Sequence, residues 1–479
     1  MNKPIRRLFI VTVLMFASLA GMLGYHQVVQ AQRLAENPYN TRKVFAQMRI
    51  ERGLILMRDK SELSANRLED DLYYRTYPGG DLAPHVTGYS DVTYGQTGLE
   101  RSRNDYLTGT ADEVELFTIL DTILGREKRG ADLRLTLVPE VQREALDQLR
   151  SIGKNGAVVV LEVKTGAVVA MVSSPSYDPN LLEANWEQLN ADPVAAPLFN
   201  RATQEIATPG SSFKLITTAA ALETGAFKPD SKFDDTKGSI DIYGNTINNY
   251  RTLPFGKHDL ADAFAQSINT TYAQVGDELG QETLFEYMKR FGLYERPPLE
   301  LPEDEVAVSG RYEAGKLAGP EKQLDPVQVA WMAIGQENLQ VTPLQMAMIA
   351  QAIGNGGEMM APYLIDTISD YHGTIIRQAD PKVWKTPIDS STAAELTEMM
   401  IMTVEEGTGS KAQTSKTQIA AKTGTAEVEG RGPNAWFVGF APAEDPKYAI
   451  AVLVEDAPDE SGAIAVPLAR DVLLAALGL

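Results

Sequence analysis

The longest apolar stretch of the chain runs from Leu8 to Tyr25, and no charged residue interrupts it. A helix over these 18 residues would be about 27 Å long, close to the ~30 Å hydrocarbon core of a bilayer. Lys3, Arg6 and Arg7 precede it, and cations mark the cytoplasmic end of a membrane helix. We therefore predict a single-pass cell-membrane protein whose N-terminus is cytoplasmic and whose remaining chain is extracytoplasmic.

A cleaved signal peptide is the alternative interpretation of the same segment. Its signature is a short apolar core followed closely by a small-residue cleavage site. Val29-Gln30-Ala31 is a weak site of this kind, and it lies several polar residues beyond a run that is long for a signal peptide. We therefore favour residues 1–25 as a cytoplasmic N-terminus and an uncleaved transmembrane anchor.

Residues 26–150 combine short strand-like segments with many turns, a pattern typical of a small mixed domain. The strand-like segments are Arg49–Met57, Tyr73–Tyr77 and Leu133–Leu137. An amphipathic helix is predicted from Val141 to Ile152, because its apolar residues recur at helical spacing. We refer to residues 26–150 as the pedestal and predict that they form an N-terminal domain.

Residues 151–479 have the pattern of a larger domain. Two β-branched runs, 156–163 and 167–172, flank a Gly-containing turn and predict a β-hairpin. The segment from about 200 to 410 is mostly helical in pattern, and strand character returns after it. The other predicted elements are helices Phe213–Glu223 and Pro343–Ile353, strands Thr417–Thr425, Ala435–Ala441 and Tyr448–Val454, and helix Ala463–Leu477. The fold class is therefore α+β, with about five antiparallel strands flanked by helices.

The composition excludes several kinds of chemistry. The 479 residues carry 44 Lys and Arg against 64 Asp and Glu, a formal net charge of −20. So acidic a chain lacks the basic surface that nonspecific nucleic-acid binding requires, and we expect no nucleic-acid partner. The chain has no Cys and only four widely separated His, so we predict no disulfide, no thiol nucleophile and no metal site.

The first candidate motif, Pro209-Gly210-Ser211-Ser212-Phe213-Lys214, places a serine and a lysine three residues apart where a helix is predicted to begin. At this spacing both side chains lie on one face of the first turn. A lysine whose pKa is lowered by burial or by nearby cations can activate a serine hydroxyl as a nucleophile. A helix cap at Ser211 and a solvated Lys214 are the alternative for this motif alone.

The second candidate motif is Ser267-Ile268-Asn269, which follows a short helix predicted from Asp259 to Gln266. In an extended loop, Ser267 and Asn269 would point to the same side. A hydroxyl there can relay a proton, and an amide can hold both a lysine and a substrate carbonyl. Taken alone, this tripeptide fits a helix-terminal cap better than a functional site.

The third candidate motif, Lys422-Thr423-Gly424-Thr425, follows a strand-like segment. A lysine with flanking hydroxyls can bind a carboxylate, and a glycine lets a substrate backbone lie along the strand. A backbone N–H near Thr425 could complete an oxyanion hole with that of Ser211. The alternative is an edge strand protected by its lysine.

The three motifs in this order, in a chain predicted to be exported, resemble the penicillin-recognising serine enzymes. The sequence is similar in particular to the class B, or monofunctional, penicillin-binding proteins, the peptidoglycan D,D-transpeptidases, and most to the short actinobacterial type. The segments that carry the similarity in the larger domain are Ser173–Asn180, Asn200-Arg201-Ala202, Gly335-Gln336, Thr342–Ala347, Gly407-Thr408-Gly409 and Trp436–Gly439. Those in the pedestal are Asn40, Arg42, Arg52-Gly53 and Gly98-Leu99-Glu100.

The chain departs from the family pattern at two places outside the three motifs. Met57 and Lys60 stand where the pedestal of the family usually carries Asp and Gly, which leaves structural details of the pedestal open. Asn434 stands where His is common, which leaves one contact on the substrate side open.

The resemblance implies a penicillin-binding transpeptidase fold and a role for each motif residue. Ser211 would attack the penultimate D-Ala carbonyl of a stem peptide ending in D-Ala-D-Ala, with Lys214 as general base. Ser267 and Asn269 would shuttle protons and hold the peptide amide. The implied substrate-binding residues are Lys422, Thr423, Gly424 and Thr425, of which the lysine and the two threonines would hold the terminal carboxylate.

The resemblance also implies the ligands and partners of the protein. An amine of a neighbouring stem peptide would take the acyl group and form a cross-link, in cell-wall synthesis and cell-shape maintenance. β-Lactams would trap Ser211 as a slow ester. No metal or organic cofactor is implied, and a membrane glycan polymerase of the SEDS type would contact the anchor and the pedestal.

Two other functions remain open on the same fold. A D,D-carboxypeptidase or β-lactamase-like hydrolase would pass the acyl group to water, and no single residue decides between water and an amine as the acceptor. A secreted hydrolase needs neither an anchor nor a pedestal, so the presence of both favours the synthetic enzyme. A non-catalytic β-lactam sensor or scaffold would have no physical need for Lys214 or Lys422.

Overall fold

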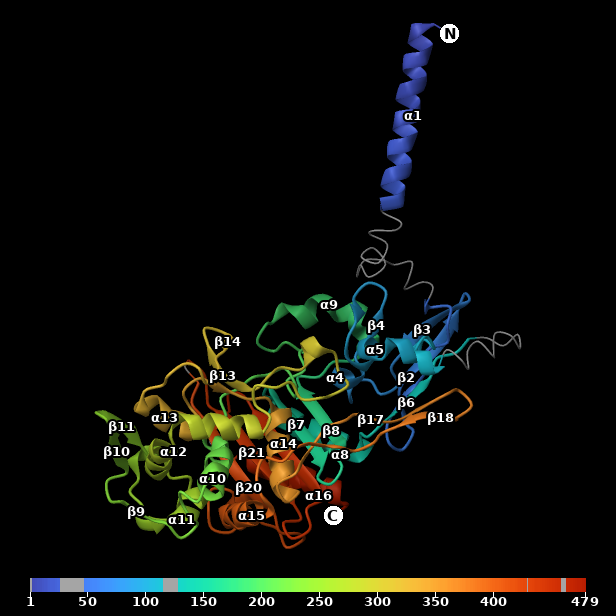
Figure 1. Ribbon diagram of the computed structural model, residues 1–479. Helices are drawn as coiled ribbons and strands as arrows, with labels where there is room; N and C mark the ends of the chain where they lie inside the picture. Colours follow the sequence, from blue (N-terminus) through green and yellow to red (C-terminus); the bar gives the residue numbers. More distant parts are fainter. Residues whose placement is uncertain (1, 26–46, 115–127, 429, 458–461) are drawn as a thin grey trace.

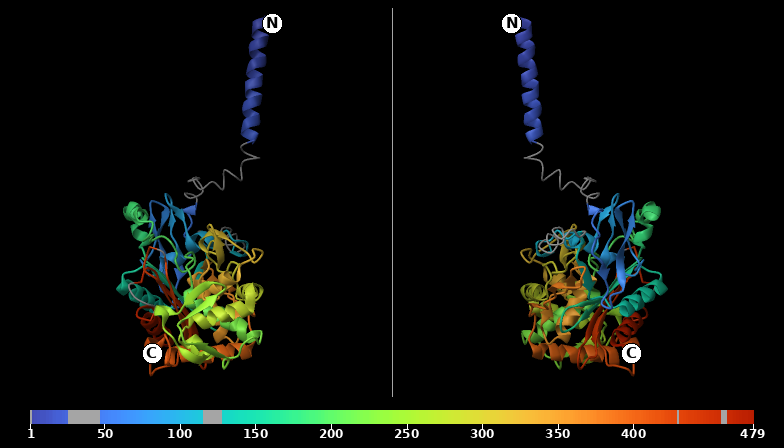
Figure 2. Two further views of the ribbon diagram at one scale, coloured as in Figure 1. Left: turned by 90° about the vertical axis from the view of Figure 1, so that its left-hand side faces the viewer. Right: turned by 90° about the vertical axis from the view of Figure 1, so that its right-hand side faces the viewer.

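The computed structural model describes residues 2–25, 47–114, 128–428, 430–457 and 462–479. Among them, one helix is long and apolar enough to cross a membrane, α1 (Lys3–Gly24), and it coincides with the predicted anchor. Helix α1 stands apart from the rest of the described chain, and none of its residues is buried (Figures 1 and 2). The alternative cleavage site at residues 29–31 lies outside the described residues.

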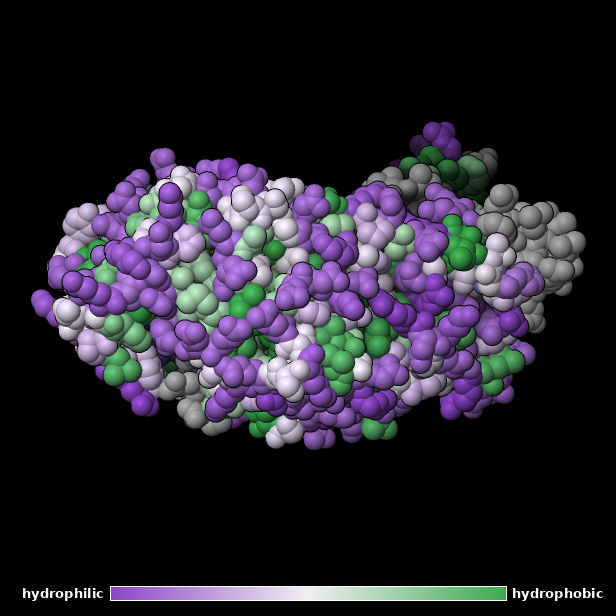
Figure 3. Space-filling model, turned by 90° about the horizontal axis from the view of Figure 1, so that it is seen from below, coloured by the Kyte–Doolittle hydropathy of each residue, from purple (hydrophilic) through white to green (hydrophobic). Residues whose placement is uncertain are grey.

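The surface of α1 differs in kind from that of the folded body. Large apolar side chains on α1 are openly exposed; Leu8 and Phe16, for example, are each 68% exposed. The face of the body shown in Figure 3 is mostly polar, with apolar side chains in small scattered groups. Because exposed apolar area is unfavourable in water, α1 is suited to lipid and the body to an aqueous phase.

The larger domain is built on a five-stranded antiparallel sheet in the order β20–β21–β22–β7–β8. The strands are β7 (Gly156–Glu162), β8 (Val168–Ser174), β20 (Ala420–Ala426), β21 (Asn434–Ala441) and β22 (Tyr448–Val454). Because β7 pairs with β22, the early hairpin and the three late strands form one sheet. This confirms the predicted fold class and strand number.

Helices cover the central strands of this sheet. Every residue of β8 is buried, as are nearly all residues of β7, β21 and β22, which requires cover on both faces. Helix α14 (Pro343–Gly354) packs against β7, β21 and β22. Helices α8 (Pro139–Ile152) and α16 (Ala465–Leu477) pack against each other, α8 also against β8 and α16 against β21 and β22 (Figure 1). The predicted helices at these positions are confirmed.

The segment between the two halves of the sheet is mainly helical, as predicted. Helix α10 (Lys214–Glu223) is buried from its first residue to Leu222. It packs against α12 (Asn269–Arg290) and α15 (Ser390–Glu405). A helix that is buried on all sides requires a mostly apolar sequence, and only Lys214 among its buried residues carries a charged side chain. The remaining helices of the larger domain are α9 (Leu182–Ala191), α11 (Leu260–Ala265) and α13 (Pro326–Ala333).

The sequence pattern did not predict the small strands of this segment. They are two to four residues long, which is too short for an alternating pattern to stand out. They are β9 (Lys232–Asp235), β10 (Ser239–Ile242), β11 (Asn245–Asn248), β12 (Gly256–Asp259), β13 (Gly310–Glu313), β14 (Lys316–Leu317), β15 (Leu339–Gln340), β16 (Met359–Met360) and β19 (Val383–Lys385).

A six-stranded sheet, in the order β18–β17–β6–β1–β2–β3, forms the pedestal side of the molecule. Its strands are β1 (Ile55–Leu56), β2 (Glu62–Glu69), β3 (Leu72–Thr76), β6 (Asp132–Leu135), β17 (Ile365–Ser369) and β18 (Ile375–Gln378). Figure 2 shows the blue pedestal strands between α1 and the green to red elements of the larger domain. The hairpin β17–β18 belongs by sequence to the larger domain, so a boundary at residue 150 divides the sequence but not this sheet.

Several short elements complete the pedestal. They are α4 (Pro84–Thr87), β4 (Ser90–Asp91), β5 (Gly95–Gln96), α5 (Gly98–Ser102) and α6 (Asn104–Leu107). The predicted strand at Arg49–Met57 is much shorter than expected, because only β1 pairs with neighbours on both sides while Glu51 makes an isolated bridge to Arg129.

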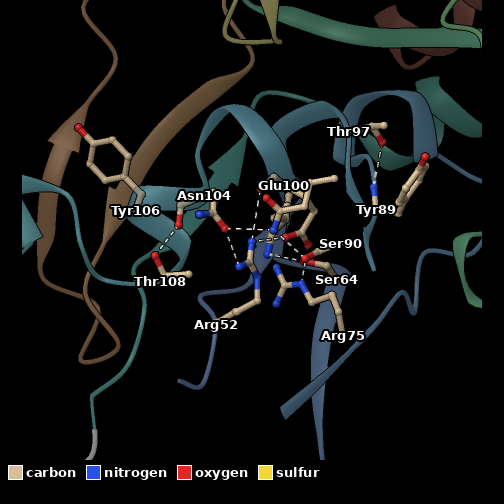
Figure 4. A network of polar contacts seen from close by, with 12 residues as sticks. Arg52, Ser64, Arg75, Tyr89, Ser90, Thr97, Glu100, Asn104, Tyr106 and Thr108 are labelled. Carbon is tan, nitrogen blue, oxygen red and sulfur yellow. Dashed lines mark hydrogen bonds and ion pairs between the residues drawn. The ribbon is translucent and has the colours of Figure 1, made fainter. Parts of the chain in front are cut away.

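A buried ion network fixes α5 against the pedestal sheet (Figure 4). Glu100 is fully buried and accepts hydrogen bonds from Arg52 Nη2 at 2.7 Å and from Arg75 Nε at 2.5 Å. Burial alone would raise the pKa of Glu100, but Arg75 and Arg52 together lower it below its ordinary value. Glu100 therefore stays ionised, and two elements far apart in sequence are held by one carboxylate.

The two departures from the family pattern have distinct structural settings. Lys60 has a φ of 72°, the left-handed region in which glycine is free of strain, so a glycine at this position is the easier choice. Met57 is 1% exposed and joins the main core, where an Asp would need a partner. Asn434 begins β21, opposite Ala426 of β20.

We expect Glu100→Gln to destabilise the pedestal strongly, by about 3 kcal/mol or more, because it leaves two buried guanidinium groups without a counter-charge. Thermal unfolding of the full-length protein in detergent measures this as a lowered transition temperature. Glu69→Gln is the matched control, because Glu69 pairs with Arg67 on the surface, where both side chains are more than half exposed. Equal transition temperatures for the two variants would contradict a structural role for the buried network.

Candidate active site

The candidate nucleophile Ser211 lies in a 3-10 turn, η3 (Gly210–Phe213), that continues directly into α10. Gly210 has a φ of 51°, and a Cβ there would lie 2.5 Å from the carbonyl oxygen of Thr425. On its other side, Gly210 N–H donates to the carbonyl of Gly335 at 3.1 Å. The turn is therefore enclosed between the third motif and the family-typical segment Gly335-Gln336.

Lys214 is the first residue of α10, and its side chain is fully buried beneath the turn. Its Nζ donates to Asn269 Oδ1 at 2.8 Å, to the Ser267 carbonyl at 2.9 Å and to Ser267 Oγ at 3.3 Å. None of these bonds goes to Ser211. Burial and, second to it, the nearby Lys422 lower the pKa of Lys214 well below its ordinary value. The first two motifs thus meet at one desolvated amine.

The second motif has a different backbone from the one predicted. Ser267 has a φ of 59°, a left-handed conformation rather than an extended one, and Asn269 begins helix α12. The preceding helix α11 is capped by Asp259, as the sequence predicted. Although the loop is not extended, Ser267 and Asn269 both face Lys214, and Asn269 Nδ2 also donates to the Asn248 carbonyl at 3.0 Å.

The third motif brings a second buried lysine to the same hydroxyl. Lys422 lies within β20, and its Nζ donates to Ser267 Oγ at 3.1 Å and to the Thr423 carbonyl at 3.1 Å. Burial lowers the pKa of Lys422 to about 7. The hydroxyl of Ser267 therefore lies between two amines, each of which is easier to deprotonate than a lysine in water.

Each buried lysine also lies over an aromatic ring. Lys214 Nζ is 5.0 Å from the centre of the Tyr272 ring, and Lys422 Nζ is 5.5 Å from the centre of the Phe264 ring. The face of an aromatic ring attracts a cation, so these rings offset part of the effect of burial on the two amines. The sequence does not distinguish these two residues, because a buried aromatic residue beside a motif looks like ordinary core.

Gly424 allows β20 to lie directly against the nucleophile turn. A Cβ on Gly424 would lie 2.7 Å from the Pro209 carbonyl oxygen and 2.8 Å from the Ser212 nitrogen. An internal contact, and not only access for a substrate backbone, therefore requires glycine here. Trp436 of β21 also holds the segment before this turn, because its Nε1 donates a hydrogen bond to the Thr208 carbonyl at 2.9 Å.

The site residues form two layers. The outer side chains are partly exposed and are those of Ser211, Ser267, Asn269 and Thr425. The inner side chains are buried and are those of Lys214, Lys422 and Thr423. The partly exposed hydroxyl of Ser267 thus lies between two desolvated amines beside the turn that carries Ser211, an arrangement suited to general-base activation and to holding an anionic group.

Comparison with known proteins covers both parts of the chain. Residues 156–474 match the penicillin binding protein transpeptidase domain, and residues 52–133 match the penicillin binding protein A dimerisation domain. The chain is 35% identical to the peptidoglycan D,D-transpeptidase PbpA of Mycolicibacterium smegmatis, over 100% of this chain and 99% of the relative. It is 34% identical to PbpA of Mycobacterium tuberculosis, with the same coverage.

Solved structures agree with this assignment. The imipenem acyl-enzyme complex of penicillin-binding protein A from M. tuberculosis has a TM-score of 0.82 at 34% identity, covering 90% of this chain and 100% of that one. The D,D-transpeptidase domain of a peptidoglycan glycosyltransferase from Eggerthella lenta has a TM-score of 0.79 at 35% identity, covering 90% and 99%. The chain therefore belongs to the penicillin-binding protein transpeptidase family, as a class B member similar to the mycobacterial PbpA proteins.

Proposed function

We propose that this protein is a peptidoglycan D,D-transpeptidase that works through a Ser211 acyl-enzyme. The observation that carries the proposal is the pair of buried lysines joined through Ser267 directly beside the nucleophile turn. Two amines with lowered pKa values have no structural use in a scaffold, but acyl transfer needs a base near neutral pH. The full-length similarity to two proteins named peptidoglycan D,D-transpeptidase supports the same reaction.

In the first step, Ser211 Oγ attacks the penultimate D-Ala carbonyl of the donor stem peptide. Lys214, whose pKa burial lowers well below its ordinary value, takes the Ser211 proton. The new bond joins Ser211 Oγ to the carbonyl carbon, and the bond to the terminal D-Ala nitrogen breaks. The hydroxyl of Ser267 passes its proton to the leaving amine and takes one from Lys214 Nζ, 3.3 Å away, so that Lys214 returns to its neutral form.

The remaining motif residues hold the donor. Lys422, Thr423 and Thr425 bind the terminal carboxylate, and Asn269 binds the peptide amide. The backbone N–H groups of Ser211 and Thr425 form the oxyanion hole, a role supported by the close approach of Thr425 to Gly210.

In the second step, an amine of a neighbouring stem peptide attacks the ester carbonyl. Lys214 takes a proton from the attacking amine and delivers it to Ser211 Oγ as the bond from the carbonyl carbon to Ser211 Oγ breaks, and the new amide is the cross-link. A β-lactam imitates the donor and leaves Ser211 acylated, in line with the acyl-enzyme complexes known for the M. tuberculosis relative.

The proposed location follows from α1 and the cations Lys3, Arg6 and Arg7 in its first two turns. The helix anchors the protein in the cell membrane with its N-terminus in the cytoplasm, so the pedestal and the catalytic domain lie outside. This position places Ser211 in the compartment that holds stem peptides. A SEDS-type glycan polymerase is the proposed membrane partner, contacted by α1 and the pedestal.

A labelled penicillin and a pair of stem peptides test the proposed function. The full-length protein in detergent should take up the label, and Ser211→Ala should not, because the ester cannot form. With donor and acceptor peptides, the wild-type protein should release D-Ala and form cross-linked product. Release of D-Ala without cross-link would identify a carboxypeptidase instead, and label retained on Ser211→Ala would exclude Ser211 as the nucleophile.

The pKa of Lys422 predicts a pH dependence of donor binding. With a pKa of about 7, Lys422 is an ammonium below that pH and neutral above it. Attraction to a carboxylate needs the ammonium, so KM for a donor with a free carboxylate should rise by up to about tenfold per pH unit above 7. KM for the methyl ester of the same donor should not rise. Equal pH dependence for the two donors would exclude Lys422 as the carboxylate partner.

The N-terminus of the mature protein tests the anchor. If α1 stays on the protein as proposed, protein purified from membranes begins at or within a residue of Met1 and requires detergent. Intact mass and N-terminal sequencing measure this directly. A mature chain that begins near Gln32 and is soluble without detergent would show that the segment is a signal peptide.

A further inference from the structure

Thr408 touches the third motif from a segment that the mechanism above does not use. It lies between α15 and the short helix η6 (Ser410–Ala412), and its side chain is exposed. Its Oγ1 lies 2.5 Å from Oγ1 of Thr423, which is only 3% exposed. An exposed hydroxyl is thus hydrogen-bonded to a buried one within the proposed carboxylate site.

The backbone holds Thr408 in place despite its exposure. The Thr408 N–H donates to the carbonyl oxygen of Ala265 at 3.2 Å, and a Cβ on the preceding Gly407 would lie 2.2 Å from that same oxygen. Ala265 is the last residue of α11, two positions before Ser267. The same stretch of backbone therefore carries Ser267 and fixes Thr408 against β20.

The direction of the Thr408–Thr423 hydrogen bond decides whether the buried hydroxyl can bind an anion. A hydroxyl has one proton to donate, and a carboxylate only accepts. If Thr423 donates to Thr408, Thr423 presents only lone pairs to the ligand. If Thr408 donates to Thr423, the Thr423 proton is free for the carboxylate, and a charge-assisted bond of this kind is stronger than a neutral one.

Thr408 has a second acceptor within reach in the absence of ligand. Its Oγ1 is 3.5 Å from the Ala265 carbonyl oxygen, a long contact that is weaker than the bond to Thr423. An arriving carboxylate favours the arrangement in which Thr408 donates to Thr423 and Thr423 donates to the ligand. Both protons then point toward the negative charge.

We propose that Thr408 is a positioning residue of the donor site, which orients the Thr423 hydroxyl toward the terminal carboxylate of the donor. This inference rests on the proposed function and deepens it, because it assigns a role in substrate binding to a residue outside the three motifs. Thr408 acts through Thr423 and does not react itself.

Thr408→Val tests the inference, because valine keeps the shape and removes the donor. The assay follows acylation of the full-length protein in detergent by a thioester donor with a free carboxylate and by its methyl ester. We expect Thr408→Val to lower kcat/KM for the free-carboxylate donor by about tenfold, chiefly through KM, which corresponds to one hydrogen bond to a charged group. The methyl ester should react at the wild-type rate, and Thr408→Ser should restore the free-carboxylate reaction.

Ser410→Ala is the matched control, because Ser410 is exposed on the same segment and should leave both donors unaffected. An equal loss for both donors in Thr408→Val would show a purely structural role, and an unchanged KM would also overturn the inference. If the wild-type protein is not acylated by the free-carboxylate donor, the proposed function fails and this inference with it. Acylation of the wild type with no effect of Thr408→Val overturns this inference alone.

Discussion

The hydroxyl of Ser267 receives hydrogen bonds from two lysines that have both been removed from water. Two ammonium groups this close repel each other, and each loses hydration, so the pair is most stable with fewer than two charges. Three elements must meet for this to happen: the buried helix α10, the turn between α11 and α12, and strand β20. The contacts around the two lysines hold these three elements together.

Close backbone packing supplies most of that support. Gly210, Gly335 and Gly424 each lie where a side chain would collide with neighbouring backbone, so the nucleophile turn fits between β20 and the segment after α13. The indole of Trp436 adds a directional bond from β21. Such contacts are intolerant of small shifts, because closely packed backbone cannot adjust as side chains do. They fix the backbone of the turn that carries Ser211 against β20.

The sequence predicted most of the fold and the three motifs that form the site. It did not predict the backbone conformation within the site or the residues from other segments that contact the motifs. Long apolar runs gave the five-stranded sheet and its helices correctly, because burial on both faces leaves a strong pattern. The strands β9 to β16 and β19 were missed, since they are too short to show one, and β2, β17 and β18 of the pedestal sheet were missed as well. The left-handed Ser267 could not be predicted, because Ser rarely adopts this conformation unless tertiary contacts impose it. The rings of Phe264 and Tyr272 and the hydroxyl of Thr408 were missed because their roles arise only when distant segments meet.

The hairpin β17–β18 has a consequence for the order in which the molecule can be completed. Strand β6 pairs with β1 on one side and with β17 on the other. During synthesis, the chain through β6 emerges with that second edge unpaired, and it stays so until Ile365–Gln378 has been made. An open strand edge invites pairing with other chains. The pedestal sheet can therefore be completed only after most of the larger domain has been made, although β20, β21 and β22 of the catalytic sheet are still to come.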